Sequence, residues 1–225
     1  MTFYDRLLDE TASERSTFLA IPIVRAAVSD GVPHDAYAAF LAQAYHHVKH
    51  TCPLLALAAA RCAEGDRAYR AALFAYIGEE AGHEEWILED LHDLGRDPEA
   101  VRTGEPDMPC RLMVAYAYYA TEHVSPYALL GMVHVLEGMS AALAGQAAAT
   151  LQRGLGLPAG KGTRYLSSHG ALDTAHVDFF RDLVNGIADP FARDAIIDTA
   201  RVVYPLYGGI FRAIGRAYEG DSREA

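Results

Sequence analysis

The segment PYALLGMVHVLEGMSAALAGQAAATLQ, residues Pro126–Gln152, decides the fold of this chain. Small residues crowd its second half, from Ala141 to Ala149, which is typical of a helix packed tightly inside a bundle. The segment contains one acidic residue, Glu137. The ionised side chain of a glutamate on a buried helix needs a cation or several hydrogen-bond donors. We therefore expect an interior helix over Pro126–Leu155 that turns Glu137 toward a functional site.

Helix-forming residues also dominate on either side of this segment, and β-branched residues never alternate over the length of a strand. The sequence predicts an all-α protein of seven helices in a single domain, residues 1–225. Only Arg96–Cys110 looks like an extended irregular loop. Breaks rich in Gly, Pro and Asp separate the helices, which are expected at Thr2–Ser29 with a break near Pro22, His34–Ala63, Asp66–Leu94, Arg111–Glu122, Pro126–Leu155, Gly160–Asn185 and Pro190–Gly220.

The composition argues against several classes of function. The 225 residues include 19 Lys+Arg and 30 Asp+Glu, a formal net charge of −11, which disfavours a protein that binds nucleic-acid phosphates. The three cysteines, Cys52, Cys62 and Cys110, predict neither a disulfide framework nor a thiolate zinc site. The acidic N-terminus is unlike a secretory signal, and apolar stretches such as Pro53–Ala60 fall far short of the ~20 residues that span a bilayer. We expect a soluble cytoplasmic protein without nucleic-acid or membrane partners.

The strongest local motif is His169-Gly-Ala-Leu-Asp173-Thr-Ala-His176, inside a predicted helix. At ~100° per residue, the three polar positions share one narrow face of that helix. Two imidazoles and a carboxylate form the mixed donor set that suits divalent Fe, Mn or Zn. A hydrogen-bonded polar stripe on a surface helix is the alternative explanation.

A second motif is GEEAGHEE, residues Gly78–Glu85. Glu80 precedes His83 by three residues and Glu79 precedes it by four, so one of the two acids flanks the histidine on a helix. We prefer Glu80, and Glu79 stays open as its replacement. Taken alone, the motif is better explained by a solvated acidic helix that continues through Glu89 and Asp90.

The three predicted helices together offer three histidines and three carboxylates. Six such ligands suffice for two adjacent metal ions with open positions. His134, one turn before Glu137, is expected to support a ligand rather than to be one. The candidate ligands are Glu80, His83, Glu137, His169, Asp173 and His176.

The order and spacing of these motifs resemble the heme-oxygenase-like diiron oxidase and oxygenase superfamily, whose TenA/PqqC-like fold also hosts other functions. The two-residue gap between Glu80 and His83 is similar to the fatty-acid decarboxylating, alkene-forming branch. Members with a wider gap hold Glu where this chain has Tyr76. The resemblance implies a seven-helix TenA-like bundle and two non-heme iron ions at the six ligands, with manganese as a substitute. It also implies O2-dependent oxidation, by C–H abstraction, of a fatty acid, an amino acid or a related small carboxylate.

Two other classes of function stay open on this fold. A metal-free, thiaminase II-like C–N hydrolase would use one of the three cysteines as its nucleophile. A non-catalytic helical protein would bind a small molecule where the metals are expected. Heme oxygenase itself needs a histidine ligand on its first helix, and no histidine precedes His34.

The substrate and the partners are the least determined part. The basic side chains of Tyr45–His50 could contact a substrate carboxylate at an entrance, although a polar helix face near the rim of a cleft explains them better. Arg164 and Arg201 are further candidates to bind the carboxylate, with surface salt bridges favoured for both. A long apolar channel would favour an alkyl carboxylate, whereas a short pocket with Arg201 or Lys49 would favour an amino acid. Besides substrate and O2, we expect an external electron donor and a homodimer.

Overall fold

A computed structural model describes the backbone of residues 1–221 and the side chains of residues 1–168 and 177–218. Every regular element within these limits is helical, so the predicted all-α class is confirmed. A π-helical turn, Ala120–Val124, and a 3-10 turn, Pro126–Ala128, precede the apolar helix α10. The helices are α1 (Phe3–Glu10), α2 (Ala12–Leu19), α3 (Pro22–Ser29), α4 (His34–Val48), α5 (Thr51–Arg61), α6 (Arg67–Glu80), α7 (His83–Asp93), α8 (Pro98–Thr103), α9 (Met108–Tyr119), α10 (Leu129–Gly154), α11 (Arg164–Asn185) and α12 (Pro190–Asp221).

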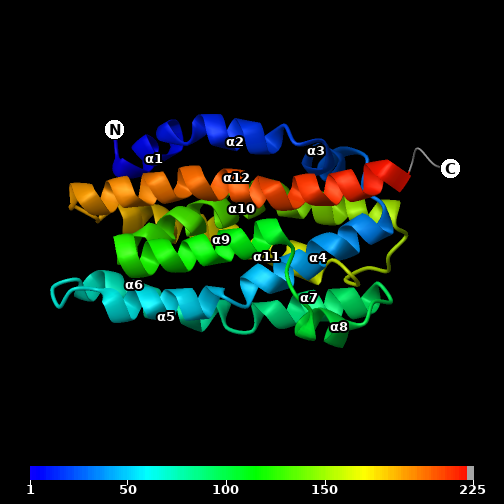
Figure 1. The fold of residues 1–225 in the computed structure, drawn as a ribbon, viewed down its shortest axis with the longest axis horizontal. Coiled ribbons are helices and arrows are strands. Elements are labelled where there is room, and N and C mark those ends of the chain that lie inside the picture. The colour runs from blue at the N-terminus through cyan, green and yellow to red at the C-terminus, as the bar shows by residue number, and fades with distance from the viewer. Residues whose placement is uncertain (222–225) are drawn as a thin grey trace.

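The helices run mostly along one axis, as Figure 1 shows. The short helices α1 to α3 lie along one long edge of the molecule, and α5 to α8 lie along the other. Helix α10 lies between them and packs against α3, α11 and α12. Gly131 permits the contact with α12, because a Cβ there would lie 2.4 Å from the carbonyl oxygen of Ile196. The segment that decides the fold is therefore the central helix of the bundle.

This central helix is apolar over a greater length than we expected from the sequence. By length and composition, Pro126–Gly154 could cross a bilayer, so the expectation that every apolar stretch falls far short was wrong here. Half of its most apolar window is buried inside the protein, and core helices of soluble proteins pass the same test. Its contacts with three neighbouring helices identify it as a core helix.

Three of the seven predicted helices are interrupted in the structure. Thr2–Ser29 forms α1, α2 and α3, and Pro22 stands in the first turn of α3, where its missing amide proton costs nothing. His34–Ala63 breaks at Lys49 and His50, where Pro53 has no amide proton for the Lys49 carbonyl. Asp66–Leu94 breaks at Gly82, whose φ is +93°. Each break turns the chain so that the flanking helices can pack on different neighbours.

The region expected to be an irregular loop, Arg96–Cys110, is partly helical. Asp97 caps α8, since its Oδ1 accepts the backbone N–H of Glu99 at 3.0 Å, and Pro98 occupies the first helical position. Helix α9 then begins at Met108. The loop prediction was therefore wrong over most of its length, although the capping signal was present in the sequence.

Asp90 fixes the start of α11, the helix that contains the His-x3-Asp-x2-His motif. Its two carboxylate oxygens accept the backbone N–H groups of Arg164 and Tyr165, both at 2.8 Å. The expectation that Asp90 is solvated was wrong, because its side chain is fully buried and burial raises its pKa to about 6. Tyr37 strengthens this anchor by donating its hydroxyl to the Gly162 carbonyl at 2.8 Å. Helix α7 thus sets where α11 begins.

Candidate functional site

A largely apolar cavity of about 170 Å³ lies along α10, between this helix and its neighbours. On α10 its lining extends from Leu129 to Leu151, a rise of ~33 Å at 1.5 Å per residue. No lysine or arginine lines it among the residues that the structure describes. Apart from tyrosines, its polar lining side chains are His47, Thr51, Glu80, Glu137 and Ser140. Two of the six candidate ligands therefore face the same cavity from different helices.

Glu80 and His83 form the first half of the candidate site. Glu80 is the last residue of α6 and His83 the first of α7, and both are buried, at 8% and 5% exposure. Nδ1 of His83 lies 3.2 Å from Oε2 of Glu80. The Trp86 ring stacks on the His83 imidazole with ring centres 4.1 Å apart, which fixes the plane of the imidazole. Glu79 is exposed, so Glu80 is the acid of this motif that faces the interior.

Glu137 forms the second half and is half-buried on α10. The Tyr76 hydroxyl donates to its Oε2 at 3.3 Å. Burial and the nearby Glu137 carboxylate raise the pKa of the Tyr76 phenol well above its usual range, so the phenol keeps its proton and acts as a donor. The sequence analysis named Tyr76 only as the residue at the position where members with a wider gap hold Glu, and did not assign it to the site.

His134 lies among aromatic rings on another side of α10. The Thr11 hydroxyl donates to the Leu7 carbonyl at 2.7 Å, so it accepts from Nε2–H of His134 at 3.4 Å. Burial lowers the pKa of His134 to about 4, so its imidazole is neutral at physiological pH. A small second cavity is lined by both His134 and Glu137, which leaves the expected supporting role as a prediction.

The remaining three candidate ligands, His169, Asp173 and His176, lie outside the side chains that the structure describes. Their segment belongs to α11, whose first turn Asp90 holds. Among the side chains of residues 1–168 and 177–218, no three of the His, Cys, Asp or Glu type are grouped as a metal site. Carboxylates from two helices facing one cavity, with an imidazole beside one of them, nevertheless fit an iron or manganese ion.

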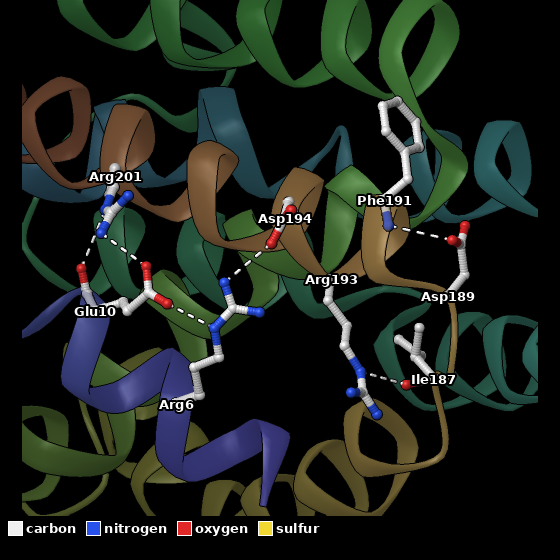
Figure 2. A network of polar contacts seen from close by, with 8 residues as sticks. All are labelled: Arg6, Glu10, Ile187, Asp189, Phe191, Arg193, Asp194 and Arg201. Atoms are coloured by element: carbon white, nitrogen blue, oxygen red, sulfur yellow. Dashed lines mark hydrogen bonds and ion pairs between the residues drawn. The ribbon is translucent and has the colours of Figure 1, made fainter.

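The basic residues considered for binding a substrate carboxylate lie elsewhere. Figure 2 shows Arg201 pointing to Glu10, whose Oε2 it contacts at 3.0 Å, and Arg6 bridging Glu10 and Asp194. Arg164 pairs with Glu89 on the surface. The favoured interpretation of both arginines as surface salt bridges is confirmed.

Within Tyr45–His50, only His47 and Val48 line the cavity. Lys49 lies 3.3 Å from Nδ1 of His46 and 5.1 Å over the Tyr45 ring, and His50 contacts the Tyr118 hydroxyl at 3.1 Å. Lys49 is not among the lining residues, so a role of this segment at the entrance stays a prediction.

None of the three cysteines lines the cavity. Burial raises the pKa of all three thiols, that of Cys110 to about 12. The Sγ atoms of Cys62 and Cys110 lie 3.2 and 3.5 Å from the backbone carbonyls of Ala58 and Gln43. These are the properties of packed core thiols, not of an activated nucleophile.

Comparisons with known proteins agree with this fold. A domain of unknown function with a heme oxygenase-like fold from Shewanella denitrificans superposes with a TM-score of 0.86, at 20% identity, over 99% of this chain and 96% of that chain. A TenA homologue from Pseudomonas syringae gives 0.80 at 9% identity over 95% and 93%. Heme oxygenase-1 from the cyanobacterium Synechocystis, in complex with heme, gives 0.78 at 13% identity over 100% and 97%.

A comparison with curated protein sequences finds no match. The model of a protein family described as iron-containing redox enzymes matches residues 38–208, which is more than half of the chain and includes all six candidate ligands. With a fold similar to those of heme oxygenase and TenA, this chain belongs to the family of iron-containing redox enzymes.

Proposed function

We propose that this protein is a non-heme diiron, O2-dependent oxidase or oxygenase that acts on an alkyl carboxylate. The observation that carries the proposal is that Glu80 and Glu137, from α6 and α10, line one apolar cavity with His83 beside Glu80. In this proposal the iron ligands are Glu80, His83, Glu137, His169, Asp173 and His176.

The donor set suits iron for chemical reasons. Carboxylates and imidazoles bind divalent iron and manganese, and six of them leave open positions on two ions. When bound, the iron pair would supply O2 activation and the oxidation of a substrate C–H bond, with electrons from an external donor. The family match to iron-containing redox enzymes supports iron, while the number of ions and the absence of heme are part of the proposal.

The chain itself contributes the shape and polarity of the cavity. Its apolar walls exclude water and offer a long surface to a hydrocarbon chain, which gains ~0.8 kcal/mol for each buried methylene. Arg201 and Lys49 lie outside it, so the short pocket that would favour an amino acid is not supported. A carboxylate head group would be held beside Glu80 and Glu137 only with a cation present.

Two other functions make different use of the same residues. A thiaminase II-like hydrolase needs a nucleophilic thiolate in the cavity, and three thiols that lie outside it with raised pKa values argue against this function. Heme binding through a histidine on the first helix is disfavoured, because no histidine precedes His34. A non-catalytic small-molecule-binding protein is separated from an oxidase by metal uptake.

Anaerobic loading with Fe(II) tests the proposal. We expect iron uptake by the wild-type protein, an absorbance change when O2 is admitted, and a melting temperature that rises with metal, since ligand at 100 Kd adds about 2.7 kcal/mol to stability. Glu80→Gln should lose iron, whereas Glu79→Gln, at the exposed neighbouring acid, should keep it. A wild-type protein that takes up no iron and shows no O2-dependent absorbance change is not this oxidase.

A further inference from the structure

Tyr76 connects the two helices that supply the candidate carboxylate ligands. It lies on α6 one turn before Glu80, and its side chain is 1% exposed. Its hydroxyl reaches across to Oε2 of Glu137 on α10, at 3.3 Å. The ring of Phe179, from α11, packs edge-on against the Tyr76 ring with centres 5.1 Å apart. One phenol therefore contacts side chains of α10 and α11 while it shares a helix with Glu80.

This contact has a direct consequence for Glu137. An ionised carboxylate accepts hydrogen bonds and metal ions through two oxygens. A donor held on Oε2 restricts the rotation of the carboxylate and so fixes the direction in which it can bind a cation. Partners of this kind orient metal ligands in many proteins, and their loss typically weakens metal binding ~10–100-fold.

We propose that Tyr76 is a positioning residue that orients the carboxylate of Glu137 before a metal ion arrives. The inference rests on the proposed function, because it assumes that Glu137 is a metal ligand. It goes further by assigning a role to a residue that supplies no ligand. Because Tyr76 lies on the same helix as Glu80, its hydrogen bond to Glu137 also ties α6 to α10 near two residues that line the cavity.

Tyr69 offers a matched comparison on the same helix. It lies two turns before Tyr76, is 4% exposed, and donates its hydroxyl to the Pro126 carbonyl at 2.9 Å. Its ring stacks on Tyr127 with centres 4.2 Å apart. Both tyrosines are buried and both hydroxyls bridge from α6 to a neighbouring segment, but only Tyr76 contacts a candidate ligand. A general packing role predicts the same consequences for the loss of either hydroxyl.

Cobalt(II) titration of the full chain separates the two roles. We expect Tyr76→Phe to weaken Co(II) binding ~10–100-fold and to change the visible ligand-field spectrum, since the Glu137 carboxylate is no longer oriented. Tyr69→Phe should keep the wild-type affinity and spectrum. Without metal, the melting temperatures of the two variants should fall by similar amounts, because each variant loses one buried hydroxyl contact.

The outcomes distinguish this inference from the function on which it rests. If the wild-type protein binds no Co(II), both are overturned. If the wild type binds Co(II) and Tyr76→Phe matches it in affinity and spectrum, only the role of Tyr76 is overturned, and equal weakening in Tyr69→Phe overturns it as well. A second measurement leaves Tyr76 unchanged. Co(II) is added to Tyr69→Phe and the ultraviolet difference spectrum of its tyrosines is recorded. We expect the spectrum to shift, and the absence of a shift contradicts the proposal.

Discussion

Glu80 ends one helix and His83 begins the next, yet Nδ1 of His83 lies 3.2 Å from Oε2 of Glu80. The two residues between them form a tight turn in which Gly82 adopts φ = +93°. The pair is therefore brought together by the turn, not by the shared face of a continuous helix. Its geometry depends on a backbone conformation that side chains with a Cβ adopt only at a cost.

Gly82→Ala should therefore disturb the candidate site through the backbone. A Cβ on Gly82 would meet no atom within 4 Å, so the cost is conformational and not steric. We expect a loss of about 1–2 kcal/mol in the free energy of unfolding, which is the cost of the left-handed region for an L-residue. Metal affinity should fall with it, because the turn places His83 beside Glu80. Chemical denaturation and a metal titration measure the two effects.

Gly78→Ala is the matched control, since Gly78 lies inside α6 and a Cβ there would also meet nothing within 4 Å. Alanine stabilises a helix interior by ~0.5–1 kcal/mol relative to glycine. We expect the two substitutions to act in opposite directions on stability. Equal effects would show that the left-handed turn at Gly82 is not what holds the pair.

Helical class was predictable, because helix formers and turn residues act locally along the chain. The helix breaks were harder to predict. Pro53 does interrupt the helix, but the chain turns before it, at Lys49 and His50. The burial of Asp90 had a detectable signal, since it lies seven residues after His83 and shares its helix face. The partners of that carboxylate are the backbone N–H groups of Arg164 and Tyr165. Local sequence patterns could not reveal them, because this contact depends on how α7 packs against α11.

The candidate site was predictable where a charged residue stands alone among apolar ones. Glu137 stands alone in an apolar helix, and the structure places it on the cavity. The position of Tyr76 was noted because members with a wider gap hold Glu there, but its hydrogen bond to Glu137 depends on helix packing that no local pattern shows. The length of the cavity also depends on the packing of several helices, so the sequence could not predict it. The sequence analysis could say only which substrate a long channel or a short pocket would favour.

Asp90 should give folding stability a measurable pH dependence. Its folded-state pKa is raised to about 6 from an ordinary 3.8, so between these pH values the folded chain holds a proton that the unfolded chain has lost. The free energy of unfolding contributed by Asp90 therefore falls as pH rises through this window, by up to about 3 kcal/mol. Asp90→Asn removes the titration, and the difference between wild type and variant should fall over the same window.

The variant is needed because His134 acts in the opposite direction. The pKa of His134 is lowered to about 4, so its contribution to stability is complete above about pH 6.5 and is lost as the pH falls toward 4. The two slopes partly cancel in the wild-type profile. Denaturation of wild type, Asp90→Asn and the exposed Asp178→Asn across this range isolates the contribution of Asp90 to stability. A wild-type-minus-Asp90→Asn difference that is flat with pH would contradict the buried carboxylate.

Ala147 offers a test of the alkyl-chain hypothesis. It is buried, lines the cavity and lies ten residues, or ~15 Å, along α10 from Glu137. Ala147→Phe should fill the far part of the cavity, so long alkyl carboxylates should lose affinity while short ones keep it. The loss should be about fourfold for each methylene excluded, from ~0.8 kcal/mol per buried CH2. Calorimetry of manganese-loaded protein with carboxylates of increasing length measures it.

Ala149→Phe is the control, because Ala149 is exposed on the same helix. It should leave the dependence on chain length as in the wild-type protein. If Ala147→Phe weakens short and long carboxylates equally, the alkyl chain does not extend along this part of α10.

Asp173 provides the sharpest test of the iron site. If His169, Asp173 and His176 all coordinate, Asp173→Ala should reduce iron content as severely as His176→Ala. A residue on a solvated surface stripe would instead tolerate the change within about 0.5 kcal/mol. Iron stoichiometry and O2 consumption should fall together in both variants, while circular dichroism reports the helix content.

The other acidic residues of α11 near Asp173 cannot take its place as a ligand. At ~100° per residue, Asp178 and Asp182 lie about 140° and 180° around the helix from position 173. Both are exposed and both contact Arg181, Asp178 at 2.9 Å and Asp182 at 3.7 Å, so neither is directed to a shared site. Asp178→Ala should therefore keep full iron loading and serves as the control on the same helix. Normal iron content in Asp173→Ala would remove the diiron hypothesis, because this helix offers no second carboxylate on that face.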